Sequence, residues 1–304
     1  MGITGKKIVA VVVTYEPNTH ILANQLGKLT SQVAHIVVVD NGSAMNLDHW
    51  VAARRYPNVQ CLSLGDNFGV ATAQNAGIDL ARRQQAEYIL LLDQDSEPAP
   101  DMVEKLLGAY ECMASQGYAV AAVGPRYVDL RQNNPPPFIR LRGLKVERCV
   151  CTAPDAIVPV DYLISSGSLI TMKTLNAVGT MADNLFIDYV DIEWGLRAKH
   201  FGYQSFGVCN AAMHHSIGEH PMKAFGRPIP LHSPLRHYYH FRNAVWLYQQ
   251  SWPSWKWKVA DAWRLLLKYG FYSMFARPRL KHLGMMTLGI WHALRGRTGR
   301  LEPR

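Results

Sequence analysis

Short apolar runs alternate with amphipathic stretches through the first half of this 304-residue chain. Runs of aliphatic and β-branched residues, which predict buried strands, cover residues 8–13, 36–39, 59–64 and 88–92. Helical periodicity is found between and after them, at residues 19–31, 71–85 and 102–116. Continuous apolar strands that alternate with helices are typical of a mostly parallel sheet covered on both faces. The pattern therefore predicts an α/β fold.

Polar residues and glycines follow each predicted strand, and one pair of carboxylates is the most informative feature among them. Asp93-Gln94-Asp95 comes directly after the apolar run 88–92. Open α/β sheets bind ligands at the carboxyl ends of their strands. Paired carboxylate oxygens at that edge suit a hard cation, Mg²⁺ or Mn²⁺, which can in turn bind a diphosphate. A solvated acidic turn is the alternative interpretation of so short a motif.

The middle of the chain is less regular. We expect a buried strand at 119–124, a strand interrupted by small residues at 162–171, and helices at 174–179 and 188–200. Prolines at 135–137 indicate a loop or an edge excursion, because proline cannot donate a hydrogen bond to a sheet. Residues 218–234 are rich in Gly, Pro and His, and we expect them to form a mobile loop.

Three acidic residues, Asp188, Asp191 and Glu193, fall near the predicted start of the helix at 188–200. On a helix Asp188 and Asp191 share a face, whereas Glu193 points roughly 200° away from Asp188. A carboxylate in a cleft acts as a general base if it lies within hydrogen-bond reach of the proton that it removes. Acidic residues also favour the first turn of a helix, so helix capping is the alternative.

Two further segments carry candidate chemistry. His214-His215 offers neutral imidazole, a ligand for Mn²⁺-like metals, although a surface histidine pair is often inert. The segment 66–77 reads as a loop that runs into a helix, in which Asn67 and Gly69 could tighten the turn. A helix N-terminus favours a bound phosphate, while a structural turn with close helix packing is the plainer interpretation.

The composition changes to aromatic and basic helix from about residue 238. Six of the eight tryptophans lie from residue 246 onward. Residues 255–304 contain eleven Lys or Arg residues and only two acids. Helical spacing places apolar side chains on one face, namely Trp255, Val259, Ala262, Trp263, Leu266 and Leu267. Such a helix suits the interface of an anionic membrane. A helix packed on the preceding domain, with a solvated basic face, is the alternative.

Charge and composition limit the remaining possibilities. The net charge of +9 comes from the C-terminal region, so it favours an anionic partner, either nucleic acid or a lipid surface. The five cysteines, an odd number without a visible secretory signal, predict reduced thiols in a cytoplasmic protein. No stretch has the ~20 apolar residues that are needed to span a bilayer. We therefore expect at most a peripheral association with the membrane.

Taken together and in order, these motifs resemble those of the family 2 glycosyltransferases, which have the GT-A fold. The resemblance covers roughly residues 6–250, and it rests on Val11-Val12-Val13-Thr14-Tyr15, Asp40-Asn41-Gly42-Ser43, Asn67-Phe68-Gly69, Asn75-Ala76-Gly77, residues 91–96, Ser166-Gly167-Ser168, residues 186–193 and His215-Ser216-Ile217-Gly218. The amino-acid sequence at 92–96, 186–194 and 238–243 is similar to that of the bacterial rhamnosyltransferase subgroup. The implied architecture is a GT-A domain at 1–240 with a helical, membrane-associating region at 241–304.

The resemblance also implies roles for individual residues. On the donor side it assigns Thr14, Tyr15 and Glu16 to the base pocket, Asp40 to the pyrimidine, Asn67 and Gln94 to the nucleotide sugar, Asp93 to the ribose and metal, and Asp95 and His215 to the metal. On the acceptor side it assigns Asp191 as the base and Glu193 as the residue that orients the hydroxyl. Asp188 departs from the plainer acid pair of many relatives, so the resemblance does not settle whether Asp188 or Asp191 takes the proton.

The implied activity is the inverting, metal-dependent transfer of a sugar from a nucleotide to a lipid-linked or polysaccharide acceptor in cell-surface glycan synthesis. The expected donor is dTDP-rhamnose, and a UDP-sugar such as UDP-galactofuranose is the alternative. A sugar nucleotidyltransferase is disfavoured, because the first strand is followed by Thr-Tyr-Glu-Pro and not by a glycine-rich basic loop. The acidic constellation also argues against a nucleic-acid-binding protein and against an inactive scaffold. The oligomeric state is left open.

Overall fold

A single mixed sheet forms the centre of the molecule. The computed structural model describes residues 6–128, 138–215, 222–224, 227–229 and 232–302. In spatial order the sheet contains β3 (Val59–Ser63), β2 (His35–Asp40), β1 (Ile8–Thr14), β4 (Tyr88–Asp93), β10 (Leu169–Thr171), β6 (Val120–Val128), β11 (Gln204–His215) and β5 (Ser96–Pro98), with β9 (Ile157–Val160) also on β11. Strands β3, β2, β1 and β4 are parallel, and so are β6 and β11, while β10, β5 and β9 run against their neighbours.

Helices cover both faces of the sheet, as the apolar runs predict. Along β1, Val9, Val11 and Val13 belong to the core on one face, and the intervening residues belong to the core on the other. The first core lies under α3 (Val70–Arg83), α5 (Met172–Val178) and α6 (Val190–His200), and the second under α1 (Thr19–Leu29), α2 (Leu47–Ala53) and α4 (Met102–Ser115). Because successive side chains of a β-strand point to opposite faces of the sheet, one strand contributes to both cores.

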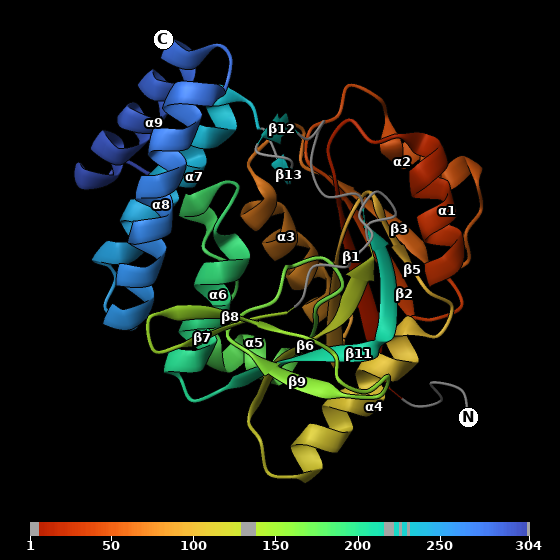
Figure 1. Ribbon diagram of the computed structural model, residues 1–304. Helices are drawn as coiled ribbons and strands as arrows, with labels where there is room; N and C mark the ends of the chain where they lie inside the picture. The colour runs from red at the N-terminus through yellow and green to blue at the C-terminus, as the bar shows by residue number, and fades with distance from the viewer. Residues whose placement is uncertain (1–5, 129–137, 216–221, 225–226, 230–231, 303–304) are drawn as a thin grey trace.

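Three C-terminal helices extend the first of these layers. They are α7 (Pro234–Gln249), α8 (Trp255–Phe275) and α9 (Arg279–Leu294), and they stack together beside α6 and α3 (Figure 1). Phe241, Ala244 and Leu247 of α7 join the same apolar core as the residues under α3 and α6. Gly289 of α9 lies against α7 so closely that an added Cβ would stand 2.5 Å from the carbonyl oxygen of Tyr238. The expected boundary after residue 240 therefore falls inside α7.

Some predicted elements differ from the structure. Only residues 169–171 of the expected strand at 162–171 are a strand, because the Ser166-Gly167-Ser168 segment forms a tight turn against β4. The helix expected at 188–200 begins at Val190, so Asp188 precedes it. Sequence reasoning also missed the short elements α2, β5, β7 (Phe138–Arg142), β8 (Lys145–Cys149), β9 and the 3-10 turn η1 (Asp183–Leu185). Within the expected mobile loop, β12 (Met222–Ala224) pairs with β13 (Arg227–Ile229).

The cysteines do not all match the prediction of reduced thiols. Cys151 and Cys209 form a disulfide, whereas Cys61, Cys112 and Cys149 are free. The prediction is therefore wrong for one pair, whose members are 58 residues apart in the sequence. Among the described residues, no helix is both long and apolar enough to cross a bilayer.

Candidate active site

The carboxyl ends of β1, β2 and β4 bring several predicted site residues to one edge of the sheet. In the strand register Thr14 lies opposite Asp40, and Val13 lies opposite Asp93. Because these strands are parallel, the loops that follow them leave the sheet on the same side. The predicted polar edge is therefore present, and it gathers residues from three separate parts of the chain.

The loop after β2 is fixed by its own polar side chains. Asp40 is buried, and one of its carboxylate oxygens accepts hydrogen bonds from the Ser43 hydroxyl at 2.6 Å and the Ser43 amide at 3.2 Å. Glu16 reaches across from the β1 loop, where its backbone N–H donates to Ser43 Oγ at 2.9 Å and its carboxylate accepts from Ala44 N–H at 2.9 Å. Asp40 and Glu16 thus shape one wall of the edge.

Two other residues assigned to the donor differ in how they meet the edge. Thr14 is fully buried, and its hydroxyl donates a hydrogen bond to the carbonyl of Val39 at 3.3 Å. Its side chain therefore does not line an open pocket, in contrast to the base-pocket role that the resemblance implied. Tyr15 is 47% exposed and can stack on a ligand. Its backbone N–H donates to Gln94 Oε1 at 2.7 Å, which ties the loop after β1 to the Asp93-Gln94-Asp95 segment.

The loop before α3 closes the far side of this edge. Asn67 accepts hydrogen bonds through Oδ1 from Asn41 Nδ2 at 3.1 Å and from Gly69 N–H at 3.0 Å, so its side chain holds the turn. Gly69 has φ +91°, and a Cβ there would stand 2.5 Å from the Phe186 carbonyl, so glycine is required. Arg300, which follows α9, donates to both Asp66 carboxylate oxygens at 2.9 Å and to the Asn67 carbonyl at 3.2 Å.

The Asp93-Gln94-Asp95 segment is held in place by the Ser166 turn. Asp93 N–H donates to Ser166 Oγ at 3.0 Å, and the same hydroxyl lies 2.5 Å from Ser96 Oγ. Both carboxylates are half-buried at the strand end. The backbone of His215 pairs with Ser96, one residue after Asp95, while the His215 side chain and the following turn lie outside the described residues.

This donor set fits a hard divalent cation in its chemistry. Two carboxylates at a strand end are oxygen ligands of the kind that Mg²⁺ and Mn²⁺ take, and the register brings the backbone of a histidine next to them. Within the described part of the chain no group of three or more metal-ligating side chains is assembled. The metal site is therefore an expectation that rests on Asp93, Asp95 and His215.

Asp191 lies at the start of α6 and faces the same edge. Burial raises the pKa of its carboxyl from 3.8 to about 6, and the negative charges of Asp188 and Asp93 raise it further, against a backbone hydrogen bond from Ile192 that lowers it. The charge of Asp93 can act in this way only if the two carboxylates are near one another. Asp191 also lines a small cavity together with Leu91 of β4 and Ser168. The end of β4 and the start of α6 therefore lie close together.

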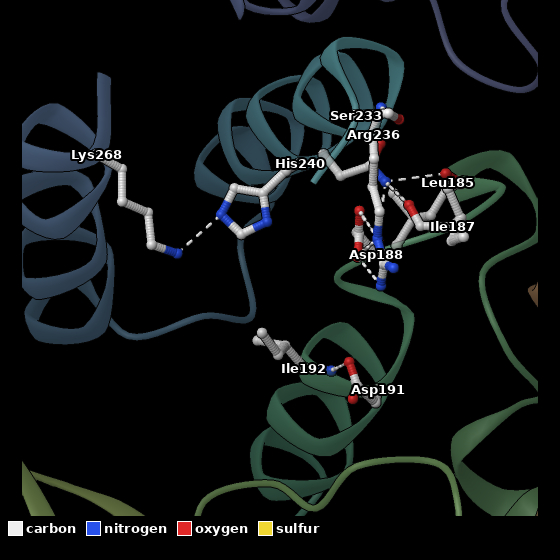
Figure 2. Close-up of polar contacts among 10 residues, drawn as sticks. Leu185, Ile187, Asp188, Asp191, Ile192, Ser233, Arg236, His240 and Lys268 are labelled. Carbon is white, nitrogen blue, oxygen red and sulfur yellow. Dashed lines mark hydrogen bonds and ion pairs between the residues drawn. The ribbon is translucent and has the colours of Figure 1, made fainter. Parts of the chain in front are cut away.

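The turn that leads into α6 has an unusual backbone. Phe186, Asp188 and Tyr189 have φ values of 66°, 62° and 65°, in the left-handed region that side-chain-bearing residues rarely adopt. Asn243 of α7 holds the turn, because its amide nitrogen donates to the carbonyls of Leu185, Ile187 and Asp188 at 2.9, 2.7 and 2.9 Å. The Asp188 carboxylate points toward Arg236 of α7, which donates to it at 3.2–3.4 Å (Figure 2).

Two of the predicted catalytic acids are therefore placed differently from Asp191. Glu193 is 1% exposed and forms a two-pronged ion pair with Arg197, at 2.8 and 3.0 Å. Both of its oxygens accept hydrogen bonds from Arg197, so this placement does not support the expected role in orienting an acceptor hydroxyl. Asp188 is ion-paired with Arg236 and does not share a helical face with Asp191, since it precedes the helix. Asp191 is the acid that remains with a raised pKa.

Sequence reasoning gave no role to the residues that hold this arrangement, although four of them lie in segments that carry the family resemblance. Polar side chains stabilise the loops of the site, namely those of Asn41, Ser43, Arg236, Arg242 and Asn243. Buried Arg and Asn side chains are unusual, so the Arg242-Asn243 pair in an otherwise aromatic stretch was the available signal.

A mostly parallel sheet with polar loops at its carboxyl edge, followed by a mixed half, is the architecture expected of the GT-A fold. The chain belongs to glycosyl transferase family 2. The model of that family matches residues 10–153. The chain is 35% identical over 246 residues to dTDP-rhamnosyl transferase RfbF of Shigella flexneri, with 80% of each chain covered. It is also 21% identical over 300 residues to the low-salt glycan biosynthesis hexosyltransferase Agl10 of Haloferax volcanii, with 96% of this chain and 92% of the relative covered.

Solved structures show the same fold at low identity. The crystal structure of GalNAc-T7 with UDP, GalNAc and Mn²⁺ superposes with a TM-score of 0.61 at 13% identity, over 96% of this chain and 56% of that one. The crystal structure of S. aureus TarS 1–349 in complex with UDP-GlcNAc gives 0.57 at 14% identity, over 96% of this chain and 92% of that one. The expected GT-A architecture is thereby confirmed.

Proposed function

We propose that this glycosyltransferase moves rhamnose from dTDP-rhamnose to a hydroxyl of a lipid-linked or polysaccharide acceptor in cell-surface glycan synthesis, with inversion at the anomeric carbon. The donor follows from the 35% identity to a dTDP-rhamnosyl transferase. The observation that carries the reaction is Asp191, a carboxyl with a pKa raised to about 6 that faces the Asp93 end of the sheet. A base with such a pKa is suited to proton transfer near neutral pH.

The residues of this chain divide the reaction between two sides. On the donor side, Tyr15, Asp40 and the Asn67 loop would hold the nucleotide. On the acceptor side, the ionised Asp191 carboxylate takes the proton of the attacking hydroxyl while the hydroxyl oxygen forms a bond to the anomeric carbon. The bond from that carbon to the diphosphate oxygen breaks on the opposite face, and the nucleoside diphosphate leaves.

A divalent cation would be held by Asp93, Asp95 and His215. When bound, Mg²⁺ or Mn²⁺ supplies positive charge that stabilises the departing diphosphate as a Lewis acid. The family resemblance assigns Asp95 as a direct ligand and places Asp93 near both the ribose and the metal.

A UDP-sugar donor is the alternative to dTDP-rhamnose. The neighbour with bound UDP-GlcNAc is consistent with this, although its 14% identity bears on the fold alone. A nucleotidyltransferase is less well supported, because the loop after β1 is built from Tyr15 and Glu16, which contact Gln94 and Ser43.

The apolar face of α8 supports peripheral attachment to the inner face of the cell membrane. Trp255, Trp263 and Leu266 are 61–64% exposed, so the stripe that could have packed on the catalytic domain faces outward. The side of α8 that packs on the protein carries Trp257, Ala260, Leu265 and Tyr272 instead. Eleven basic residues against two acids after residue 254 complement an anionic lipid surface. A cytoplasmic location completes this proposal, although the Cys151–Cys209 disulfide is of a kind more common in oxidising compartments.

The substitution Asp191→Asn should remove the base with little change in shape. We expect transfer to fall by about 10²–10⁴-fold while nucleotide binding is kept. In the wild type kcat/KM should decline as the pH falls below about 6, since protonation of Asp191 removes the base. Steady-state rates from pH 5 to 8 and calorimetric binding of dTDP measure both effects. An unchanged rate in the variant would exclude Asp191 as the base.

A donor panel tests the substrate and the metal together. Release of nucleoside diphosphate is measured from dTDP-rhamnose and from UDP-sugars, with Mn²⁺, with Mg²⁺ and with EDTA, with and without a membrane lipid extract. We expect the fastest release from dTDP-rhamnose with metal and extract. We also expect Asp95→Ala to lose the metal dependence, whereas Asp79→Ala, an exposed acid on α3, should behave like the wild type. Preference for a UDP-sugar would favour the alternative donor, and full activity in EDTA would rule out the metal.

Attachment to the membrane is tested with vesicles. The wild type should sediment with vesicles rich in phosphatidylglycerol and much less with phosphatidylcholine vesicles, because both the apolar stripe and the basic charge contribute. Trp263→Glu combined with Leu266→Glu should release it. Leu144→Glu, at the exposed turn between β7 and β8, is the control. Equal sedimentation of the double variant would contradict this role of α8.

A further inference from the structure

His240 of α7 and Lys268 of α8 form a polar pair in the C-terminal helices, near the turn that carries Asp188 (Figure 2). Lys268 Nζ lies 3.0 Å from His240 Nε2. A lysine ammonium has N–H donors and no acceptor, so the imidazole Nε2 must be the acceptor of this hydrogen bond. The contact therefore fixes which nitrogen of His240 carries the proton.

The remaining nitrogen of His240 is a hydrogen-bond donor. Burial and the nearby cations, Lys268 foremost, hold the pKa of the His240 imidazole well below its usual value, so the ring is neutral. A neutral imidazole that accepts at Nε2 carries its proton at Nδ1. Figure 2 shows this second nitrogen on the side of the ring toward Asp188. Among the residues that the structure describes, no atom accepts a hydrogen bond from Nδ1.

The charges around this pair are mixed, and the exposed Arg264 adds a second positive charge near Lys268. Arg236 is paired with Asp188 at 3.2 Å. Asp261 instead accepts hydrogen bonds from the hydroxyls of Tyr189 and Tyr248, at 2.8 and 2.7 Å. Within the described ranges Lys268 has no carboxylate within ion-pair distance, although it is half-buried and its burial lowers the pKa of the ammonium. A desolvated cation of this kind gains from a bound anion.

The pair lies against the turn that precedes the proposed base, and away from the nucleotide loops. The ring of His240 meets Tyr189 edge-on, with centroids 5.0 Å apart, two residues before Asp191. Asp188 acts electrostatically on both Lys268 and Asp191. The nucleotide loops, by contrast, follow β1, β2 and β4. A group bound at His240 and Lys268 would therefore belong to the acceptor.

We propose that His240 and Lys268 form an anion subsite that binds a phosphate or carboxylate oxygen of the acceptor, with His240 Nδ1–H donating to that oxygen and Lys268 supplying the charge. The identification of the ligand as the acceptor rests on the proposed function. The substrate class is then an anionic acceptor, and its anion positions the hydroxyl that Asp191 deprotonates.

Anion binding can be tested without any turnover. Metal-free protein labelled with ¹⁵N-histidine is titrated with inorganic phosphate and separately with acetate, and the His240 signals are assigned as those lost in His240→Phe. We expect the Nδ1–H form in the free protein and a saturable shift on adding phosphate, acetate or both, where the stronger response identifies the group. Absence of a shift with either anion would overturn the subsite, whatever the enzyme's donor is.

Matched variants identify the source of the charge. Lys268→Met should abolish the shift, and Lys268→Arg should keep most of it. Lys258→Met is the control, because Lys258 is also half-buried on α8 and contacts a neutral group, the Gln250 carbonyl. An unchanged titration in Lys268→Met, or loss of the shift in Lys258→Met as well, would contradict the assignment.

Kinetics separate acceptor binding from a merely structural role. With the membrane lipid extract as acceptor, Lys268→Met should raise the acceptor KM by about tenfold, the equivalent of ~1.4 kcal/mol. The donor KM and the slow hydrolysis of donor without acceptor should stay within about twofold. Equal losses in all three quantities would show a general structural effect and would contradict the subsite. If no donor is turned over at all, the proposed function fails while the anion titration still decides the subsite.

Discussion

The left-handed turn before α6 is the constraint on which the site depends. Phe186, Asp188 and Tyr189 each occupy a backbone region that costs on the order of 1–3 kcal/mol for such residues. Three carbonyls of the turn accept hydrogen bonds from one side-chain amide, that of Asn243. This residue belongs to α7 and is fully buried. Without that partner the turn would relax toward ordinary φ values. The start of α6, and with it Asp191, would then lose its fixed place opposite Asp93.

This dependence makes the C-terminal helices part of the active site. The buried Arg242 adds contacts to the carbonyls of Asn184 and Leu185. Asp261 of α8 accepts a hydrogen bond from Tyr189, and Arg236 of α7 holds the Asp188 carboxylate. The helices therefore do two things at once. Their inner side orders the catalytic turn, and the outer side of α8 presents an apolar and basic surface that suits a membrane.

The same arrangement links membrane attachment to the choice of acceptor. The stripe through Trp263 and Leu266 lies on α8, the helix that also supplies Lys268 to the proposed anion subsite. An acceptor anchored in the lipid surface would reach the protein at this helix. In this account the donor enters at the carboxyl edge of the sheet, and the acceptor meets it from the side of the C-terminal helices.

Local patterns were enough to predict the sheet and its polar edge. The apolar run 88–92 and the acids after it form β4 and its end as expected, because both follow from neighbouring residues. The roles of the acids near α6 were harder to predict. The left-handed φ of Asp188 depends on Asn243, 55 residues away, and the disulfide joins cysteines 58 residues apart. The Glu193–Arg197 ion pair could have been predicted from the sequence, since an acidic and a basic residue four positions apart on a helix commonly pair.

Hydrogen exchange in Asn243→Ala tests most directly whether α7 holds the catalytic turn. We expect faster exchange of amides in residues 185–192, with β1 and β4 unchanged and with glycosyl transfer reduced. Gln249→Ala, which removes a polar side chain near the end of the same helix, should leave that segment protected. Wild-type protection of residues 185–192 in Asn243→Ala, together with an unchanged transfer rate, would show that α7 does not hold the turn.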